Sequence, residues 1–226
     1  MKVLAIVQAR MGSTRLPNKV MREVGGIPLI ELLLTRLSQS TAIDQIVLAT
    51  SIDPKNIPLV QHVESLGYQS FQGSENDVLE RFYFAAQQFA GDIIIRITGD
   101  CPLIDPQLVD EAIRKFKTGD VDYLCNANPP TFPDGLDIEV FSFAALERAH
   151  NEAPSPSDRE HVTPYIRESG HFSTLNTTAD QDFSNLRWTV DEDQDLEVVR
   201  FVVEHFAPDR LFSWKDVLRI YETYSV

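Results

Sequence analysis

Three mostly apolar runs, Val3–Val7, Gln45–Thr50 and Asp92–Thr98, divide the first half of the chain. Polar residues bound each run, which is typical of strands buried on both faces of a parallel sheet. Between the runs, apolar residues recur at helical spacing. The pattern predicts strands at residues 3–7, 45–50, 68–71, 92–98 and 121–125, and helices at 28–37, 56–66, 77–89 and 106–116. Strands that alternate with helices predict an α/β fold with a mainly parallel sheet.

The regular alternation stops at the proline-rich stretch Asn128–Pro133. Residues 137–141 then alternate like an antiparallel strand. Beyond them the pattern predicts helices at 142–149 and 157–168, strands at 171–176 and 187–190, and helices at 196–205 and 213–221. We therefore expect one domain over residues 1–226 in which about 126–180 form an inserted smaller lobe.

The charge balance and the apolar runs limit the possible partners. Lys and Arg total 20 against 34 Asp and Glu, a net charge of −14 with a pI near 4.7, which excludes a generic nucleic-acid coat protein. The first apolar run is too short for a signal peptide, and no run approaches the roughly 18 residues of a membrane span. We expect a soluble, cytoplasmic protein without membrane insertion or a nucleic-acid partner.

A basic loop follows the first predicted strand. Residues 10–22 contain four basic side chains and no acidic one, inside an acidic protein. The carboxyl end of a parallel strand is where open α/β sheets bind ligands. Gly12 lets backbone N–H groups come close to a ligand, Ser13 and Thr14 offer hydroxyls, and basic charge suits a polyphosphate. A solvated basic loop is the alternative, and neither G-x-G-x-x-G nor G-x-x-x-x-G-K-[ST] is present.

Two aspartates follow strand-like runs about ninety residues apart. Asp100 comes after the run ending at Thr98, and Asp191 comes after residues 187–190. Carboxylates at one edge of a sheet can hold Mg²⁺ against phosphate oxygens. Asp100 can equally be a turn residue. Asp105, before Pro106, is better explained as a helix N-cap.

The loop reads Q-A-R-M-G-S-T-R-L-P-N-K, and later strings read G-D-C-P-L-I-D, D-G-L-D-I-E-V, R-E-H-V-T-P-Y and R-W-T-V-D. Together they resemble the cytidylyltransferases that activate acidic sugars, such as CMP-Kdo and CMP-sialic acid synthetases. The greatest resemblance is to the spore coat polysaccharide biosynthesis protein F family. Asn18 stands where that family usually has Gly. Asn tolerates positive φ better than other non-glycine residues, so the loop can keep its shape.

The resemblance implies a Rossmann-like α/β/α nucleotidyltransferase sheet, a homodimer through the lobe, and a site for CTP and Mg²⁺. The implied catalytic residues are Arg10, Lys19, Asp100 and Asp191. The implied nucleotide-binding residues are Ala9, Arg10, Gly12, Ser13, Thr14, Arg15, Lys19, Ser74, Asn76 and Asp100. The implied metal ligands are Asp100 and Asp191, with Asp193 assisting. By pattern alone, residues 74–77 are a helix cap.

An acceptor would lie in the lobe, opposite the nucleotide. The candidates there are Asp137, Glu139, Arg159 and His161. The function implied by the resemblance is CTP-dependent transfer of CMP to an anionic acceptor, such as an acidic sugar, with release of pyrophosphate. The product would be a precursor of a surface polysaccharide or glycoconjugate. A nucleotide-sugar-dependent glycosyltransferase and a non-catalytic nucleotide-binding module are the alternatives. The D-x-D match that we consider for a glycosyltransferase, Asp191–Asp193, lies late in the chain.

Overall fold

The computed structural model describes residues 1–221 of the chain. Its main sheet has the strand order β5-β4-β1-β6-β8-β7-β9. The strands are β1 (Val3–Gln8), β4 (Gln45–Ser51), β5 (Gln69–Gly73), β6 (Ile93–Thr98), β7 (Tyr123–Cys125), β8 (Glu139–Ser142) and β9 (Thr174–Asn176). β1 is parallel to β4 and β6, and β4 is parallel to β5. The predicted α/β fold with a mainly parallel sheet is confirmed.

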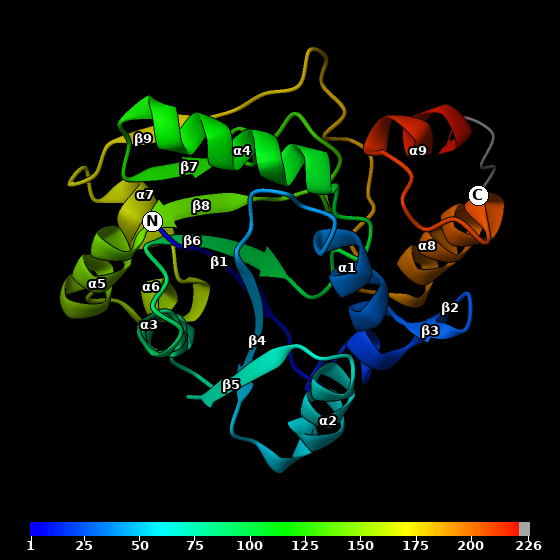
Figure 1. The fold of residues 1–226 in the computed structure, drawn as a ribbon, viewed down its shortest axis with the longest axis horizontal. Coiled ribbons are helices and arrows are strands. Elements are labelled where there is room, and N and C mark those ends of the chain that lie inside the picture. Colours follow the sequence, from blue (N-terminus) through cyan, green and yellow to red (C-terminus); the bar gives the residue numbers. More distant parts are fainter. Residues whose placement is uncertain (222–226) are drawn as a thin grey trace.

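Helices cover both faces of this sheet (Figure 1). They are α1 (Leu29–Leu37), α2 (Ile57–Ser65), α3 (Val78–Gln88), α4 (Pro106–Gly119), α5 (Phe143–Glu152), α6 (Pro156–His161), α7 (Pro164–Glu168), α8 (Asp193–Phe206) and α9 (Trp214–Tyr221). One hydrophobic cluster joins α1, α2 and α4 to one face, and a second joins α3, α5 and α7 to the other. The arrangement is the expected α/β/α layering. Within residues 1–221, no helix is long and apolar enough to cross a bilayer.

The alternation of side chains along β1 explains why the strand lies in the centre. Val3, Ala5 and Val7 belong to the cluster on one face, whereas Leu4 and Ile6 belong to the cluster on the other. Successive side chains of a strand point to opposite faces, so an uninterrupted apolar run satisfies both layers. Each larger side chain that is fully buried contributes roughly 1.5–3 kcal/mol. The buried strand β1 therefore fixes the basic loop that follows it at the edge of the sheet.

Residues 126–180 contribute to the main sheet, although we expected this segment as a lobe outside it. β8 lies antiparallel between β6 and β7, and β9 runs parallel to β7. Glu139 is therefore a residue of the central sheet, because it pairs with Arg96 of β6 in the strand register. The expected roles of the segment in acceptor binding and dimer contact stay predictions.

The expected helix at residues 157–168 is wrong, because α6 and α7 are separate. Val162 ends α6 at φ 72°, and Pro164 begins α7. Proline has no N–H to donate to the carbonyl four residues earlier, so one helix cannot run through this position. The expected strand at 171–176 begins only at Thr174.

Residues 187–190 do not form the expected strand. They make one isolated bridge, between Asp134 and Arg187, and are held by burial of Trp188 and Val190 against α8 and α9. α8 lies beside the hairpin of β2 (Glu23–Val24) and β3 (Ile27–Pro28), and α9 packs on α8 (Figure 1). α8 begins at Asp193, three residues before the expected Leu196. Glu192 is its N-cap, and the carboxylate of Asp195 accepts the Glu192 N–H at 2.9 Å.

Candidate functional site

A cavity of about 670 Å³ lies at the carboxyl ends of β1 and β6, and we call it the strand-edge cavity. It is the edge at which open α/β sheets bind ligands. The expected site residues that line it are Ala9, Arg10, Gly12, Ser13, Thr14, Arg15, Lys19, Asn76, Asp100, His161 and Asp191. Those that do not line it are Ser74, Asp137, Glu139, Arg159 and Asp193.

The basic loop takes its shape from three positions. Asn18 has φ 58°, the left-handed conformation that asparagine tolerates, so its substitution for the family's usual glycine is accommodated. A buried amide from Asn56 accepts the Met11 N–H at 2.8 Å and is itself anchored on β4. A Cβ on Gly99 would lie 2.6 Å from that of Ala9, so only glycine lets the ends of β6 and β1 approach so closely. Sequence reasoning missed Asn56, because nothing local marks it as a support.

Lys19 joins two carboxylates: Asp100, after the end of β6, and Asp191, after the irregular segment 187–190. Its Nζ lies 2.8 Å from Asp100 Oδ2 and 2.8 Å from Asp191 Oδ1. The backbone brings the two aspartates together, because the Val190 N–H donates to the Asp100 carbonyl at 2.8 Å. Burial alone would lower the pKa of Lys19, but the two carboxylates outweigh it and raise the pKa above its ordinary value. The predicted convergence of Asp100 and Asp191 is confirmed in the geometry.

Arg187 holds the other side of Asp191. Its guanidinium lies 2.8 Å from Asp191, 2.9 Å from Asp134 and 2.9 Å from Asp195. Burial would raise the pKa of Asp191, whereas Lys19, Arg187 and Arg15 lower it below its usual value. Sequence reasoning did not assign Arg187 a role, although it opens the R-W-T-V-D string. The arginine fixes the orientation of one carboxylate of the pair.

The donor set around Lys19 fits a divalent cation that also contacts phosphate. A positive group already lies between the two carboxylates, and Mg²⁺ binds one or two carboxylates together with phosphate oxygens and water. No cluster of three or more His, Cys, Asp or Glu forms a metal cage within the part of the chain that the structure describes. Asp193 is not brought to this point: its side chain is 81% exposed and lies 3.6 Å from Arg22.

The segment before α3 caps the helix, as expected, and also forms part of the cavity wall, whereas its contact with a nucleotide stays a prediction. Asp77 caps α3 by accepting the Glu80 N–H at 2.8 Å, and Ser74 accepts the Asp77 N–H at 3.0 Å. Ser74 thus holds the backbone of the N-cap residue Asp77, whereas Asn76 lines the cavity. Behind them, the buried Arg81 donates to the Ser74 carbonyl at 2.5 Å. Burial lowers the pKa of Arg81 to about 10.

Two of the four acceptor candidates have internal partners. Glu139 is buried, accepts bonds from the Tyr123 and Thr163 hydroxyls at 2.6 Å and pairs with Arg96. Arg159 lies 2.6 Å from Asp77 and donates to a carbonyl of α5, so it ties α6 to the start of α3. These contacts stabilise the fold around the site, and nothing local in the sequence marks them because their partners are far away along the chain. Acceptor binding by Glu139 or Arg159 stays a prediction.

The other two candidates have no such side-chain partners among residues 1–221. His161, at the end of α6, lines the strand-edge cavity. Asp137 makes no hydrogen bond or ion pair with any residue between 1 and 221, and the buried amide of Asn126 clamps the backbone on both sides of it. Burial, helped by the neighbouring Asp134 and Glu139, raises the pKa of Asp137 to about 6.

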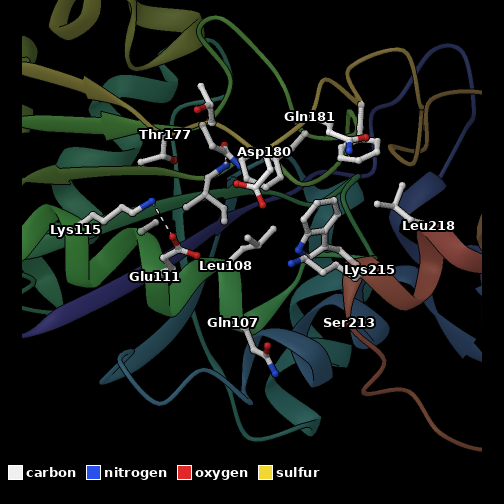
Figure 2. A pocket seen from close by; sticks show the side chains of 18 of the residues that line it. Gln107, Leu108, Glu111, Lys115, Thr177, Asp180, Gln181, Ser213, Lys215 and Leu218 are labelled. Atoms are coloured by element: carbon white, nitrogen blue, oxygen red, sulfur yellow. Dashed lines mark hydrogen bonds and ion pairs between the residues drawn. The ribbon is translucent and has the colours of Figure 1, made fainter.

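A second cavity, of about 570 Å³, lies between α4, residues 177–183 and α9, and we call it the α4–α9 cavity (Figure 2). Lys115 points toward Glu111 one helical turn away, at 2.7 Å, and Lys215 lies over the Trp214 ring. None of the residues implicated by the sequence lines this cavity. The strand-edge cavity is therefore the candidate active site.

The model of a protein family described as Cytidylyltransferase matches residues 4–201. This chain belongs to the cytidylyltransferase family. Residues 4–201 include the basic loop, Asp100 and Asp191, so the match covers the whole of the candidate site. Family membership makes the protein a nucleotidyltransferase enzyme.

Individual relatives agree with the family. The spore coat polysaccharide biosynthesis protein SpsF of Bacillus subtilis is 40% identical over 172 residues, which are 73% of this cytidylyltransferase and 70% of that protein. A 3-deoxy-manno-octulosonate cytidylyltransferase of Chloroherpeton thalassium is 34% identical over 118 residues, 51% of this chain and 46% of that one. A solved cytidylyltransferase from Leptospira borgpetersenii has 32% identity and a TM-score of 0.94, covering 99% of this chain and 94% of that one.

Proposed function

We propose that this cytidylyltransferase uses CTP to transfer CMP to a small anionic acceptor, with release of pyrophosphate. The observation that carries the proposal is the meeting of the basic loop with the carboxylates of Asp100 and Asp191 at Lys19. Positive groups for a triphosphate and carboxylates for a divalent cation are both needed for nucleotidyl transfer. The strand-edge cavity brings them together in one place.

The loop would bind the triphosphate. Arg10 and Arg15 line the cavity with 49% and 60% of their side chains exposed, so both are accessible to phosphate oxygens. Together with Lys19 they would neutralise charge that develops on the leaving pyrophosphate. Ser13 and Thr14 would add hydroxyl donors beside Gly12, where a Cβ would meet no atom within 4 Å. The chain needs no nucleophile of its own, because the acceptor oxygen attacks the α-phosphorus directly.

Asp100 and Asp191 would hold Mg²⁺ in this proposal. The ion would supply positive charge shared by the triphosphate and the attacking oxygen of the acceptor. Arg187 would keep Asp191 oriented, because it already binds the carboxylate oxygen that faces away from Lys19.

The acceptor would enter beside Asp137 and His161. Two relatives are named for spore coat polysaccharide synthesis and for a 3-deoxy-manno-octulosonate reaction, which supports an acidic sugar and a role in surface polysaccharide precursors. We infer a cytoplasmic location, where CTP is available, and a homodimer through residues 126–180. The transfer of CMP to the acceptor requires neither the cytoplasmic location nor the homodimer.

A thermal-shift comparison tests the nucleotide half of the proposal. The unfolding temperature is measured with CTP, UTP, ATP or GTP, each with and without Mg²⁺, because a ligand of the native state stabilises it by mass action. We expect the largest rise with CTP and Mg²⁺. Pyrophosphate release is then measured with 3-deoxy-manno-octulosonate and other acidic sugars. A rise only with a nucleotide diphosphate sugar would contradict the proposal and favour a glycosyltransferase.

A further inference from the structure

The ammonium of Lys19 lies at the point where two carboxylates from distant parts of the chain converge. Asp100 is 81 residues away and Asp191 is 172 residues away, yet each has an oxygen 2.8 Å from Nζ. The Lys19 side chain is 14% exposed, so the contact is mostly shielded from water. Shielded charges interact more strongly than charges on an open surface. A cation of the chain itself therefore lies where the carboxylates are best placed to hold one.

The proposed function needs the same point for Mg²⁺. An ammonium and a divalent cation cannot both lie between the same two carboxylate oxygens, because like charges at such a separation repel strongly in a partly buried site. We propose that Lys19 is a placeholder cation that holds Asp100 and Asp191 together and leaves them when metal and triphosphate bind. This role rests on the proposed function, and it makes Lys19 the residue that couples the two ligands.

The local structure lets the Lys19 side chain move while its backbone stays in place. The Lys19 N–H donates to the Leu16 carbonyl at 3.1 Å, and the next side chain, Val20, is buried. The ammonium stands on a four-carbon stem with several rotatable bonds. Residues 12–15 line the same cavity, so phosphate oxygens bound there would lie within reach of the stem. The ammonium can exchange carboxylate oxygens for phosphate oxygens without unfolding the loop.

When Lys19 leaves, Asp100 has no basic partner among residues 1–221, whereas Asp191 still has two. Asp191 keeps Arg187 at 2.8 Å and Arg15 at 3.0 Å. Asp100 has no other ion pair among residues 1–221, so a metal ion replaces its only counter-charge. It follows that a metal ion alone competes with Lys19 and binds weakly. A triphosphate that attracts Lys19 away promotes metal binding, and by thermodynamic linkage the metal promotes triphosphate binding.

The experiment measures Mn²⁺ binding without nucleotide, from the electron paramagnetic resonance signal of the free ion. The wild type is compared with Lys19→Met, Arg15→Met and Lys115→Met. Each variant removes one positive charge, but only Lys19 lies between both carboxylates. We expect Lys19→Met to bind Mn²⁺ at least roughly tenfold more tightly than the wild type, and Arg15→Met less than about threefold. Lys115→Met, in the α4–α9 cavity, should equal the wild type.

An equal affinity of Lys19→Met and the wild type would overturn the placeholder role, and so would an equal gain in Arg15→Met. The gain should also disappear in the double variant Lys19→Met, Asp191→Asn. Lys19→Gln is a second variant in case the first does not fold. Failure of both to fold overturns the proposal, because a contact that folding requires cannot open during binding. A wild type that binds no CTP with Mn²⁺ rejects the proposed function instead.

Discussion

The strand-edge cavity and the α4–α9 cavity have similar volumes, about 670 and about 570 Å³, but their charges are arranged differently. In the first, Lys19 binds carboxylates that are 81 and 172 residues away in sequence. In the second, Lys115 binds Glu111 on the same helix, four residues away (Figure 2). An exposed pair of the second kind stabilises a helix by only a few tenths of a kcal/mol.

This difference teaches that volume is a poor guide to the site in this protein. Three separate segments, ending in Lys19, Asp100 and Asp191, meet at the strand-edge cavity because buried strands and a buried Trp188 hold them there. At the α4–α9 cavity, by contrast, Lys115 forms its ion pair with Glu111, one turn away on the same helix. Partly buried charges from distant segments cost desolvation free energy when they are brought together, and such clusters are typical of functional sites. The following variants test the contrast.

The largest effect is expected for Asp191→Asn. Loss of its charge removes one carboxylate of the pair, so pyrophosphate release from CTP and Mg²⁺ should fall by about 10²–10³-fold or more, measured with an acidic sugar that the wild type accepts. The matched control is Asp180→Asn, which removes an exposed carboxylate from the α4–α9 cavity and should change the rate less than about twofold. Equal losses in the two variants, with both folded, would refute the contrast between the cavities.

Asp137→Asn should change the pH dependence of stability. The pKa of Asp137 is about 6 in the folded protein against an ordinary value of 3.8, so the native state binds more protons than the unfolded state in that window. Wild-type stability is therefore lost as pH rises from about 4 to 6, and the variant avoids this loss. At pH 8 the variant should be more stable by up to about 3 kcal/mol, and at pH 3 the difference should disappear. Urea unfolding at both pH values measures it.

Arg187→Met should weaken the orientation of Asp191. Its guanidinium binds three carboxylates but is partly exposed, so solvent screening limits the expected loss of stability to about 1 kcal/mol. The Mg²⁺-dependent part of the thermal shift with CTP should also shrink. Arg200→Met is the control, because Arg200 contacts one exposed carboxylate on the surface of α8, at 2.7 Å. The role of Arg187 would be disproved by a CTP shift identical in the two variants.

The smallest effect is expected for Lys115→Met. Its pair with Glu111 is half exposed and local, so the variant should lose at most about 0.5 kcal/mol in urea unfolding. The thermal shift with CTP and Mg²⁺ should equal that of the wild type. A reduced shift would mean that the α4–α9 cavity takes part in nucleotide binding, and the comparison would then have to be revised.

Much of the sheet could be predicted from local patterns. The run at 3–7 and the runs at 45–50 and 92–98 became β1, β4 and β6 within about one residue at each end. These strands are buried on both faces, so hydrophobicity alone marks them. The basic loop could also be located from a local pattern, because a cluster of basic residues after a strand in an acidic chain indicates a site for an anionic ligand. Asn18 in this loop takes the left-handed conformation that asparagine was expected to tolerate.

The predictions failed where long-range contacts outweigh local patterns. Residues 187–190 look like a strand, but burial of Trp188 and one bridge hold them in irregular structure. The sequence also gave no sign that Glu139 pairs with Arg96 and Arg159 with Asp77, 43 and 82 residues away. Neither pairing leaves a local signal, because each depends on which strands and helices become neighbours.

The sequence by itself determined the strands of the sheet, the basic loop after β1 and the type of side chain available at each strand end. Hydrophobic period and charge are properties of neighbouring residues, and they are present before folding. Only the tertiary structure decided that Lys19 lies between Asp100 and Asp191, that Arg187 holds one of them, and that Asp137 has no hydrogen-bond or ion-pair partner among residues 1–221. The position of Asp191 depends on the packing of α8 and α9 against α1, the β2–β3 hairpin and Trp188, because this packing brings charges that are distant in sequence to one edge of the sheet.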